Sequence, residues 1–277
     1  GYIIDAVNNK GYRLVGEPDI VTKEKIEAAL TTSVIGRELY YYDETDSTNI
    51  RAKLAGETDG THGALFVANE QNAGRGRRGR AWSTPKGTSI AMTFLLRPDV
   101  PIENVSRLTI LSALATARAL ADTAGLQAQI KWPNDIYWHD KKIAGILIEN
   151  VLSGSTFSRA IIGMGLNINQ KNFYSDAPNP VSLYQITGRT YKIEKILDEF
   201  TEAFGKRYTD TFTNSSDRIH KEYIAALYRN DGVYPFYSDG NIFHASIADV
   251  ELDGHLLLST ESGEKKRFAF KEVSFLL

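Results

Sequence analysis

The densest group of residues able to do chemistry is a run from Gly74 to Arg80, in the order Gly-Arg-Gly-Arg-Arg-Gly-Arg. Guanidinium groups and free backbone amides on a glycine-rich loop can together enclose the oxygens of a phosphate ester. The alternative interpretation is a solvated basic loop or a nucleic-acid contact, which is the more common use of an arginine run. The three spaced glycines also match the dinucleotide-binding fingerprint, but that fingerprint must open a helix. The residues that follow, from Ala81 to Gly87, are typical of a loop.

A second group of chemically capable residues is Lys131-Trp132-Pro133-Asn134-Asp135. Lys131 ends an apolar run, where strand alternation can point it inward. A buried lysine needs an anionic partner or loses its proton. That partner can be a structural carboxylate, for instance Asp135 or Glu149, or the carboxylate or phosphate of a substrate. Proline after Trp132 restricts its neighbour and fixes a rigid turn, which Asn134 and Asp135 can continue as an Asx-type turn.

Two glycines, Gly163 and Gly165, stand at alternate positions of an otherwise apolar strand. Glycine weakens a strand, so a pair on one face indicates the close approach of a flat ligand or of another backbone. The alternatives are a bulge or tight packing. The triplet Ser47-Thr48-Asn49 opens a short helical run, where its hydroxyl and amide groups can cap the helix or bind a small polar ligand.

Composition excludes several other chemistries. The chain has no cysteine, which rules out disulfides and thiolate sites and fits a reducing cytoplasm. Its five histidines are scattered without metal-binding spacing, and no Walker-type loop or Gly-x-Ser-x-Gly elbow occurs, so we assign no metal ligands. A net charge of −2 gives no global basic field of the kind that a dedicated nucleic-acid binder carries. No apolar run is long enough to span a bilayer.

These motifs need a mixed scaffold of strands and helices to position them. Thr22 is expected to cap a helix that runs to Leu30, and a long buried helix from Pro101 to Ala124 is expected to stop at Gly125. A second amphipathic helix carries Ile196, Phe200, Ala203, Phe204 and Tyr208 on one face. Apolar strands are predicted at 37–42, 64–68, 89–96, 129–132, 136–138, 142–150 and 159–169, with the last three antiparallel neighbours.

The two ends of the chain have a different character from the middle. Residues 1–14 are typical of a hairpin, which is too small to be stable alone. Past about Tyr228, short strands alternate with glycine turns, as in a small β-barrel or sandwich. The chain begins at Gly1, and its only methionines are Met92 and Met164, so we expect that a segment is missing before it.

Taken in order, the motifs resemble the biotin protein ligases. The resemblance is carried by Ser47-Thr48-Asn49, by Gln71 to Trp82, by Lys131 to Asp135, by Lys142 to Glu149 and by Gly163 to Asn167. It implies an α/β (α+β) fold: a mixed β-sheet flanked by helices, related to the class II aminoacyl-tRNA synthetase core, plus a small C-terminal SH3-like β-barrel. The implied domains are a winged-helix remnant at 1–16, a catalytic domain at 17–228 and the C-terminal domain at 229–277.

The resemblance implies that ATP activates biotin to biotinyl-5′-AMP, with Mg²⁺ accompanying ATP, and that biotin then passes to a lysine of a biotin carboxyl carrier protein. The implied catalytic residues are Lys131, Arg75 and Arg77, with Lys131 bridging the biotin carboxylate and the α-phosphate. The implied biotin-binding residues are Ser47, Thr48, Asn49, Gln71, Gly74, Arg75, Gly76, Arg77, Lys131, Gly163 and Gly165. The implied ATP and adenylate contacts are Arg77, Arg78, Arg80, Trp82, Lys131, Asn134 and Asn167.

Members of the family that also regulate transcription carry a winged helix-turn-helix whose wing ends in a phrase like residues 10–14. We therefore expect a bifunctional ligase and repressor that binds operator DNA only with the missing N-terminal part, forms a homodimer and has a cytoplasmic location. Two rival hypotheses remain. One is lipoate attachment, although the triple-glycine loop of that branch is missing from the sequence. The other is a ligand-responsive repressor without catalysis, against which Lys131 and the arginine loop argue.

Overall fold

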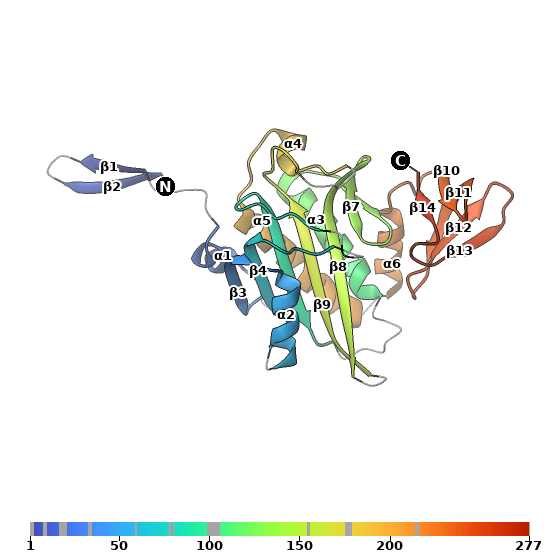
Figure 1. Cartoon of the computed structure of the whole chain (residues 1–277), viewed down its shortest axis with the longest axis horizontal. Helices are drawn as coiled ribbons and strands as arrows, with labels where there is room; N and C mark the ends of the chain where they lie inside the picture. Colours follow the sequence, from blue (N-terminus) through green and yellow to red (C-terminus); the bar gives the residue numbers. More distant parts are fainter. Residues whose placement is uncertain are drawn as a thin grey trace.

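The structure is a computed structural model that describes residues 3–7, 10–16, 21–32, 35–58, 60–76, 79, 81–98, 106–153, 156–174, 179–213 and 216–276. Figure 1 shows three parts along the long axis: an N-terminal hairpin, a central body of sheet and helices, and a C-terminal sheet at the opposite end. Within the described residues, no helix is both long and apolar enough to cross a membrane.

The central body is built on a seven-stranded mixed sheet with the order β3-β4-β5-β9-β8-β7-β6. Only β3 and β4 pair in parallel, and helix α2 connects them; the other neighbours are antiparallel. The strands are β3 (Leu39–Thr45), β4 (Ala64–Gln71), β5 (Ser89–Leu96), β6 (Gln129–Lys131), β7 (Asp135–Trp138), β8 (Lys141–Ser153) and β9 (Thr156–Asn167). The predicted mixed sheet, with its antiparallel run from β7 to β9, is confirmed.

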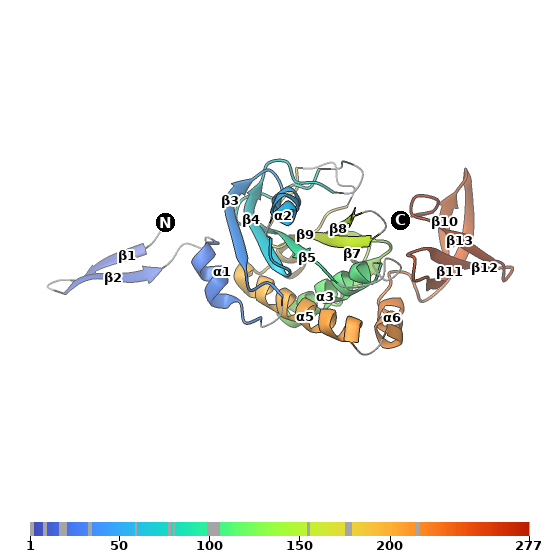
Figure 2. The same ribbon diagram turned by 90° about the horizontal axis from the view of Figure 1, so that it is seen from below.

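Helices cover both faces of this sheet. Figure 2 shows α3 and α5 along one face and α2 against the other. The amphipathic stripe of α5 is confirmed, because Ile196, Phe200 and Phe204 are fully buried and the Phe204 ring stacks on Phe94 of β5 at 4.7 Å between centroids. Each such side chain contributes about 1.5–3 kcal/mol by leaving water. The helices are α1 (Lys23–Ala29), α2 (Thr48–Glu57), α3 (Arg107–Ala124), α4 (Leu183–Thr187), α5 (Ile193–Thr213) and α6 (Ser216–Ala225).

The helix ends follow the predicted signals. The Thr22 side chain accepts a hydrogen bond from the backbone of Lys25 at the start of α1, as an N-cap should. Gly125 ends α3 with a left-handed φ of 67°, which costs glycine no steric strain. Helix α3 begins at Arg107 rather than at the predicted Pro101, and residues 101–105 lie outside the described part of the chain.

The C-terminal part is a five-stranded antiparallel sheet with the order β13-β12-β11-β10-β14. The predicted β-rich tail is therefore confirmed, while closure into an SH3-like barrel stays a prediction because β13 and β14 are the two edge strands of that order. The strands are β10 (Tyr234–Ser238), β11 (Asn241–Val250), β12 (Leu256–Thr260), β13 (Lys265–Phe268) and β14 (Ser274–Phe275). The domain boundaries at 16 and 228 also stay predictions.

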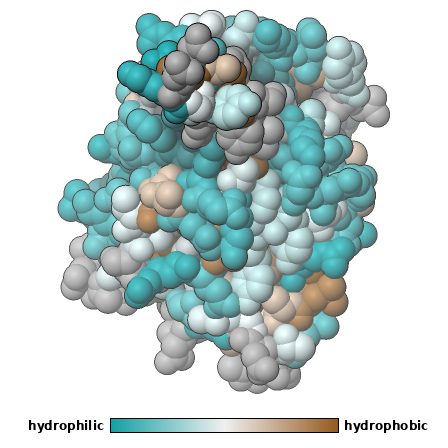
Figure 3. Space-filling model, turned by 90° about the vertical axis from the view of Figure 1, so that its left-hand side faces the viewer, coloured by the Kyte–Doolittle hydropathy of each residue, from teal (hydrophilic) through white to brown (hydrophobic). Residues whose placement is uncertain are grey.

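The predicted N-terminal hairpin is confirmed as β1 (Ile3–Val7) paired antiparallel with β2 (Gly11–Gly16). It carries exposed apolar side chains, including Tyr12 at 83% exposure. The face of the molecule drawn in Figure 3 is mostly hydrophilic, with hydrophobic residues in small separate patches. The largest cluster of buried apolar side chains includes residues of the central sheet, of α3 and α5 and of the C-terminal sheet.

Candidate functional site

The start of α2 and the end of β4 form a hydrogen-bonded polar cluster. The Thr48 backbone and hydroxyl both donate to Gln71 Oε1, at 2.8 and 3.1 Å, and Gln71 Nε2 donates to the Thr84 hydroxyl at 3.2 Å. Ser47 stands at the N-cap position of α2, yet its hydroxyl makes no capping hydrogen bond, although the residue is buried. Capping therefore does not explain Ser47, and two of the predicted biotin residues, Thr48 and Gln71, are in direct contact.

Asn49 extends this cluster across the sheet. Thr93 of β5 donates to Asn49 Oδ1 at 2.8 Å, and Asn49 Nδ2 donates to the Glu149 carboxylate of β8 at 2.8 Å. The Asn49 carboxamide lies directly over Gly163, where an added Cβ would come within 1.9 Å of Asn49 Oδ1. Gly163 is thus explained in this structure by the close approach of a side chain from α2, rather than by another backbone.

Trp82 lies over the second glycine of the pair. A Cβ on Gly165 would meet the indole at 2.2 Å, and one on Gly145, the register partner of Gly165 in β8, would meet it at 3.3 Å. Trp82 Nε1 is buried and has no hydrogen-bond partner among the described residues. A buried donor without a partner costs about 1–3 kcal/mol unless an acceptor reaches it. Gly145 and Gly165 make room for the Trp82 indole. The indole N–H is a hydrogen-bond donor available to a ligand on this face.

Lys131 ends β6 and is partly buried. Its ammonium donates to the Tyr137 hydroxyl at 3.2 Å, and it forms no ion pair within the described residues. Of the two candidate carboxylates, Asp135 is bound instead by Lys142 at 2.6 Å and Glu149 accepts from Asn49. Burial lowers the pKa of Lys131 from 10.5 to about 8, and Asp135 opposes this only in part. Within the described residues neither carboxylate forms an ion pair with Lys131, which favours the substrate-anion alternative.

The turn after Lys131 is held to the next strands. Trp132 and Pro133 are joined by a cis peptide bond. Asn134 Nδ2 donates to the backbone carbonyl of Ile146, at 2.5 Å, which links the turn to β8, while the Asx-type turn stays a prediction. Asn167, at the end of β9, is buried and accepts a hydrogen bond from Gln170 at 3.1 Å. The roles of Asn134 and Asn167 toward the adenylate stay predictions.

The arginine loop is described only in part, since Arg77, Arg78 and Arg80 lie outside the described residues. The loop begins as an antiparallel connection, with Trp82 N donating to Gly74 O at 2.9 Å and Arg75 bridged to Ala81. A Cβ at Gly74 would lie 2.4 Å from the Trp82 carbonyl oxygen, so only glycine fits. Arg75 is exposed and Gly76 is partly buried. No direct contact joins Arg75 to Lys131 in the described structure.

Two separate chains of contacts link some of the predicted residues across the sheet. One runs from Gln71 through Thr48 and Thr93 to Asn49, and the other from Trp82 through Lys142 to Asp135 at the hairpin of Lys131. Lys142 Nζ lies 5.6 Å from the centre of the Trp82 ring. Sequence reasoning gave no role to several of these partners (Thr84, Thr93, Tyr137 and Lys142), nor to Tyr228 and Phe275, whose rings lie 6.0 and 5.5 Å from Lys131 Nζ. Lys142 falls inside a quoted motif, whereas Phe275 had no local signal at all.

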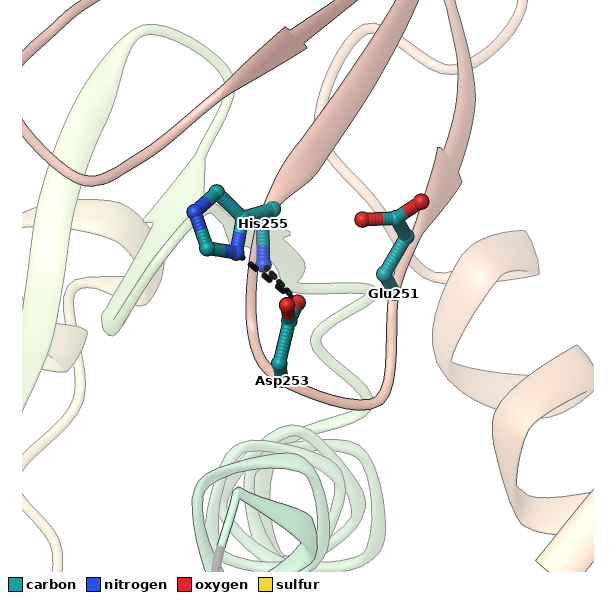
Figure 4. Close-up of side chains that lie close together, drawn as sticks. All are labelled: Glu251, Asp253 and His255. Atoms are coloured by element: carbon teal, nitrogen blue, oxygen red, sulfur yellow. Dashed lines mark hydrogen bonds and ion pairs between the residues drawn. The ribbon is translucent and has the colours of Figure 1, made fainter. Parts of the chain in front are cut away.

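One group of potential metal ligands stands in the described residues, on the turn between β11 and β12 (Figure 4). His255 contacts Asp253 through both its backbone and its ring, and Arg267 binds the carboxylates of Glu251 and Asp253. The guanidinium already binds both carboxylates, and the third group is a histidine nitrogen, whereas Mg²⁺ prefers oxygen ligands. We therefore assign no magnesium site to this turn. Its neighbour Gly254 instead accepts a hydrogen bond from Trp132 Nε1 at 3.0 Å.

Comparisons with known proteins agree with the fold and the site. Residues 41–167 match the Biotin/lipoate A/B protein ligase family. The bifunctional ligase/repressor BirA of Bacillus subtilis (strain 168) is 34% identical over 275 residues, which are 97% of this chain and 84% of that protein. The biotin–[acetyl-CoA-carboxylase] ligase of Paracoccus denitrificans is 36% identical over 192 residues, 67% of this chain and 79% of its own.

A solved structure shows the same architecture. The biotin protein ligase of Aquifex aeolicus in complex with biotin and ATP superposes with a TM-score of 0.72 at 26% identity, covering 86% of this chain and 98% of that one. The architecture of this chain is thus that of a solved protein-modifying ligase. The chain belongs to the biotin/lipoate A/B protein ligase family, and the similar proteins named above lie on its biotin side.

Proposed function

We propose that this protein activates biotin with ATP and attaches it to a lysine of an acceptor protein. In the first step a carboxylate oxygen of biotin attacks the α-phosphorus of ATP, the bond between that phosphorus and the α,β-bridging oxygen breaks, and pyrophosphate leaves as biotinyl-5′-AMP forms. In the second step the lysine amine attacks the biotinyl carbonyl, AMP leaves, and the amine gives up a proton. The first step brings two anions together, so it needs fixed positive charge in a site that excludes water.

The observation that carries this proposal is Lys131, an ammonium that is partly buried without a carboxylate partner in the described residues. A cation held in this way is available to two approaching anions, the biotin carboxylate and the α-phosphate. Binding either anion favours the charged form of Lys131 and raises its pKa. Asp135 would weaken this role if it paired with Lys131, but Lys142 holds it at 2.6 Å.

The polar cluster at α2 suits the ureido end of biotin. Ser47, Thr48 and Gln71 offer hydroxyl and amide groups that can pair with a ureido oxygen and its two N–H groups. Asn49 fixes the cluster from behind rather than lining it, because its carboxamide is bound to Thr93 and Glu149. The fused rings then lie along β9 near Gly165, beside the Trp82 indole.

The arginine loop supplies the remaining positive charge. In this proposal Arg75, Arg77, Arg78 and Arg80 gather around the phosphate of the adenylate, and Gly74 and Gly76 allow the backbone to approach it. Closure of the loop would also keep water from hydrolysing the mixed anhydride. Trp82, Asn134 and Asn167 are proposed as further adenylate contacts. Mg²⁺ is expected to arrive with ATP and shield the triphosphate.

The acceptor is proposed to be a biotin carboxyl carrier protein, as the name of the Paracoccus denitrificans relative suggests. Incubation with biotin and ATP labelled at the α-phosphate should yield labelled biotinyl-AMP. Adding a carrier domain should then discharge the label as AMP and increase the carrier mass by one biotinyl group. A carrier in which the acceptor lysine is replaced by arginine is the matched control. Labelled lipoyl-AMP in place of biotinyl-AMP would assign the protein to lipoate attachment, and no adenylate from folded protein would refute both.

A second candidate function is transcriptional repression. It is supported by the Bacillus subtilis relative, named a bifunctional ligase/repressor, to which the similarity includes 97% of this chain. The exposed hairpin of β1 and β2 suits a wing of a DNA-binding unit. Footprinting with the protein as its gene encodes it should show protection that biotin and ATP strengthen, and the lack of a footprint would confine the protein to ligation. Light scattering with and without biotin and ATP tests the expected homodimer, which a persistent monomer would refute.

A further inference from the structure

Three aromatic rings from three separate elements surround the Lys131 ammonium. Its Nζ lies 4.4 Å from the ring centre of Tyr137 in β7, 5.5 Å from that of Phe275 in β14 and 6.0 Å from that of Tyr228 in the connection after α6. A cation within about 6 Å of a ring centre is attracted by the negative face of the ring. These three rings are the aromatic cage.

Backbone pairing explains why two of the rings reach Lys131. Tyr137 lies on β7, which forms a tight hairpin with the strand of Lys131. The connection after α6 adds to the same strand, because Ile130 N donates to Ala226 O at 2.8 Å and Tyr228 N donates to Ile130 O at 2.9 Å. This connection leads directly into the C-terminal sheet.

The third ring comes from the C-terminal sheet itself. Phe275 of β14 packs on Phe236 at 5.0 Å and on Tyr228 at 6.0 Å between ring centres. The sheet is held against the central body by the hydrogen bond from Trp132 Nε1 to Gly254 O and by Arg229, which donates to the Leu276 carbonyl. These two hydrogen bonds hold the C-terminal sheet, and with it Phe275, in place beside Lys131.

We propose that the C-terminal sheet completes the adenylation site by supplying Phe275 to this aromatic cage, which positions the Lys131 ammonium without neutralising it. A carboxylate in the same place would also hold the ammonium, but substrate anions would have to displace it. Aromatic rings attract the cation and carry no net charge, so the positive charge stays available. Tyr137, Tyr228 and Phe275 are positioning residues in this scheme.

Charged groups on several elements affect the pKa of Lys131, and the aromatic cage acts in addition to them. Asp135 on β7 and Asp140 on the following turn favour the ammonium, whereas Lys142 on β8 and Arg229 after α6 oppose it. Burial is the largest influence and lowers the pKa of Lys131 to about 8. Removing one ring while keeping its bulk should therefore lower that pKa further, because it removes attraction for the cation without admitting water.

The test compares Phe275→Leu with Phe275→Tyr in the full chain, and it rests on the proposed function only for its activity readout. Phe243→Leu is the matched control, since Phe243 also packs on Phe236, at 6.0 Å, and its ring contacts Lys266 rather than Lys131. Biotin-dependent ATP–pyrophosphate exchange should fall about 3- to 30-fold in kcat/KM for Phe275→Leu, as expected for a lost cation–π contact. Phe275→Tyr and Phe243→Leu should keep near wild-type exchange.

A second readout does not depend on activity. The pKa of Lys131 is measured by NMR on ¹³C-lysine-labelled protein, with its signal assigned from Lys131→Arg. Phe275→Leu should lower this pKa relative to wild type, and Phe275→Tyr should leave it in place. An unchanged pKa in folded Phe275→Leu would overturn the cage. No exchange with biotin in wild type would refute the proposed function, and the titration would still decide the cage.

Discussion

The close approach of Trp82 to Gly165 gives a prediction whose size can be worked from the structure. In Gly165→Ala the added Cβ would lie 2.2 Å from the indole, whereas ordinary contacts begin near 3.4 Å. The indole must therefore move by more than about 1 Å. As a rigid ring it cannot rotate away in the way that the end of a flexible side chain can. Overpacking of this kind costs about 1–3 kcal/mol of folding free energy. For a chain of this size, that predicts a fall in Tm of roughly 2–12 °C.

A double-mutant cycle assigns the cost to Trp82. The free energy of unfolding is measured by urea titration for wild type, Gly165→Ala, Trp82→Ala and the double variant. The cost of Gly165→Ala should largely vanish in the Trp82→Ala background, because the clashing ring is gone. The matched control is Gly163→Ala, which meets Asn49 at 1.9 Å and should keep its full cost without Trp82. If Gly165→Ala cost the same free energy of unfolding in both backgrounds, the packing of Trp82 against Gly165 of β9 would be refuted.

Three further predictions concern the lysine, the domain contact and the polar cluster. Because the pKa of Lys131 is lowered to about 8, the free enzyme loses this cation as pH rises through that value. The kcat/KM for adenylation should therefore fall above about pH 8, and activity maintained up to the range of an ordinary lysine would contradict this. Trp132→Phe removes the hydrogen bond to Gly254 and should cost about 1 kcal/mol in urea unfolding; unchanged stability would count against that contact. Glu149→Ala frees the Asn49 carboxamide and should raise the KM for biotin about fivefold with little change in kcat, whereas Glu149→Gln keeps an acceptor and most of the affinity.

Local signals in the sequence predicted those helices and strands whose ends are determined by nearby residues. Thr22 caps α1, Gly125 stops α3 in a left-handed conformation, and β5 covers the predicted residues 89–96. Strand β3 begins at Leu39 and continues to Thr45 instead of covering 37–42, because its parallel pairing to β4 extends to Gln71. That pairing joins distant segments, and no local pattern of residues defines it.

The candidate site was predicted by its motifs rather than by its contacts. The sequence singled out Lys131 but left its partner open between a nearby carboxylate and a substrate anion. Nearness along the chain does not reveal that Lys142 binds the Asp135 carboxylate. The two spaced glycines indicated a close approach, yet the approaching groups are side chains from α2 and from the arginine loop. Phe275 lies beside Lys131 only because the C-terminal sheet docks there, a long-range contact without a sequence pattern.

The measurement that tests the central claim most directly is ATP–pyrophosphate exchange with biotin, with lipoate and without any acid. It is made on wild type, on Lys131→Ala and on Lys141→Ala, an exposed neighbouring lysine on β8 that serves as the control. We predict that, of the acids tested, only biotin supports exchange. The exchange rate should be retained in Lys141→Ala and reduced by at least about 100-fold in Lys131→Ala, the size expected for a lost charge-stabilising group. Equal exchange in Lys131→Ala and wild type would contradict the role of Lys131, and no exchange with any acid from folded protein would contradict the adenylation reaction itself.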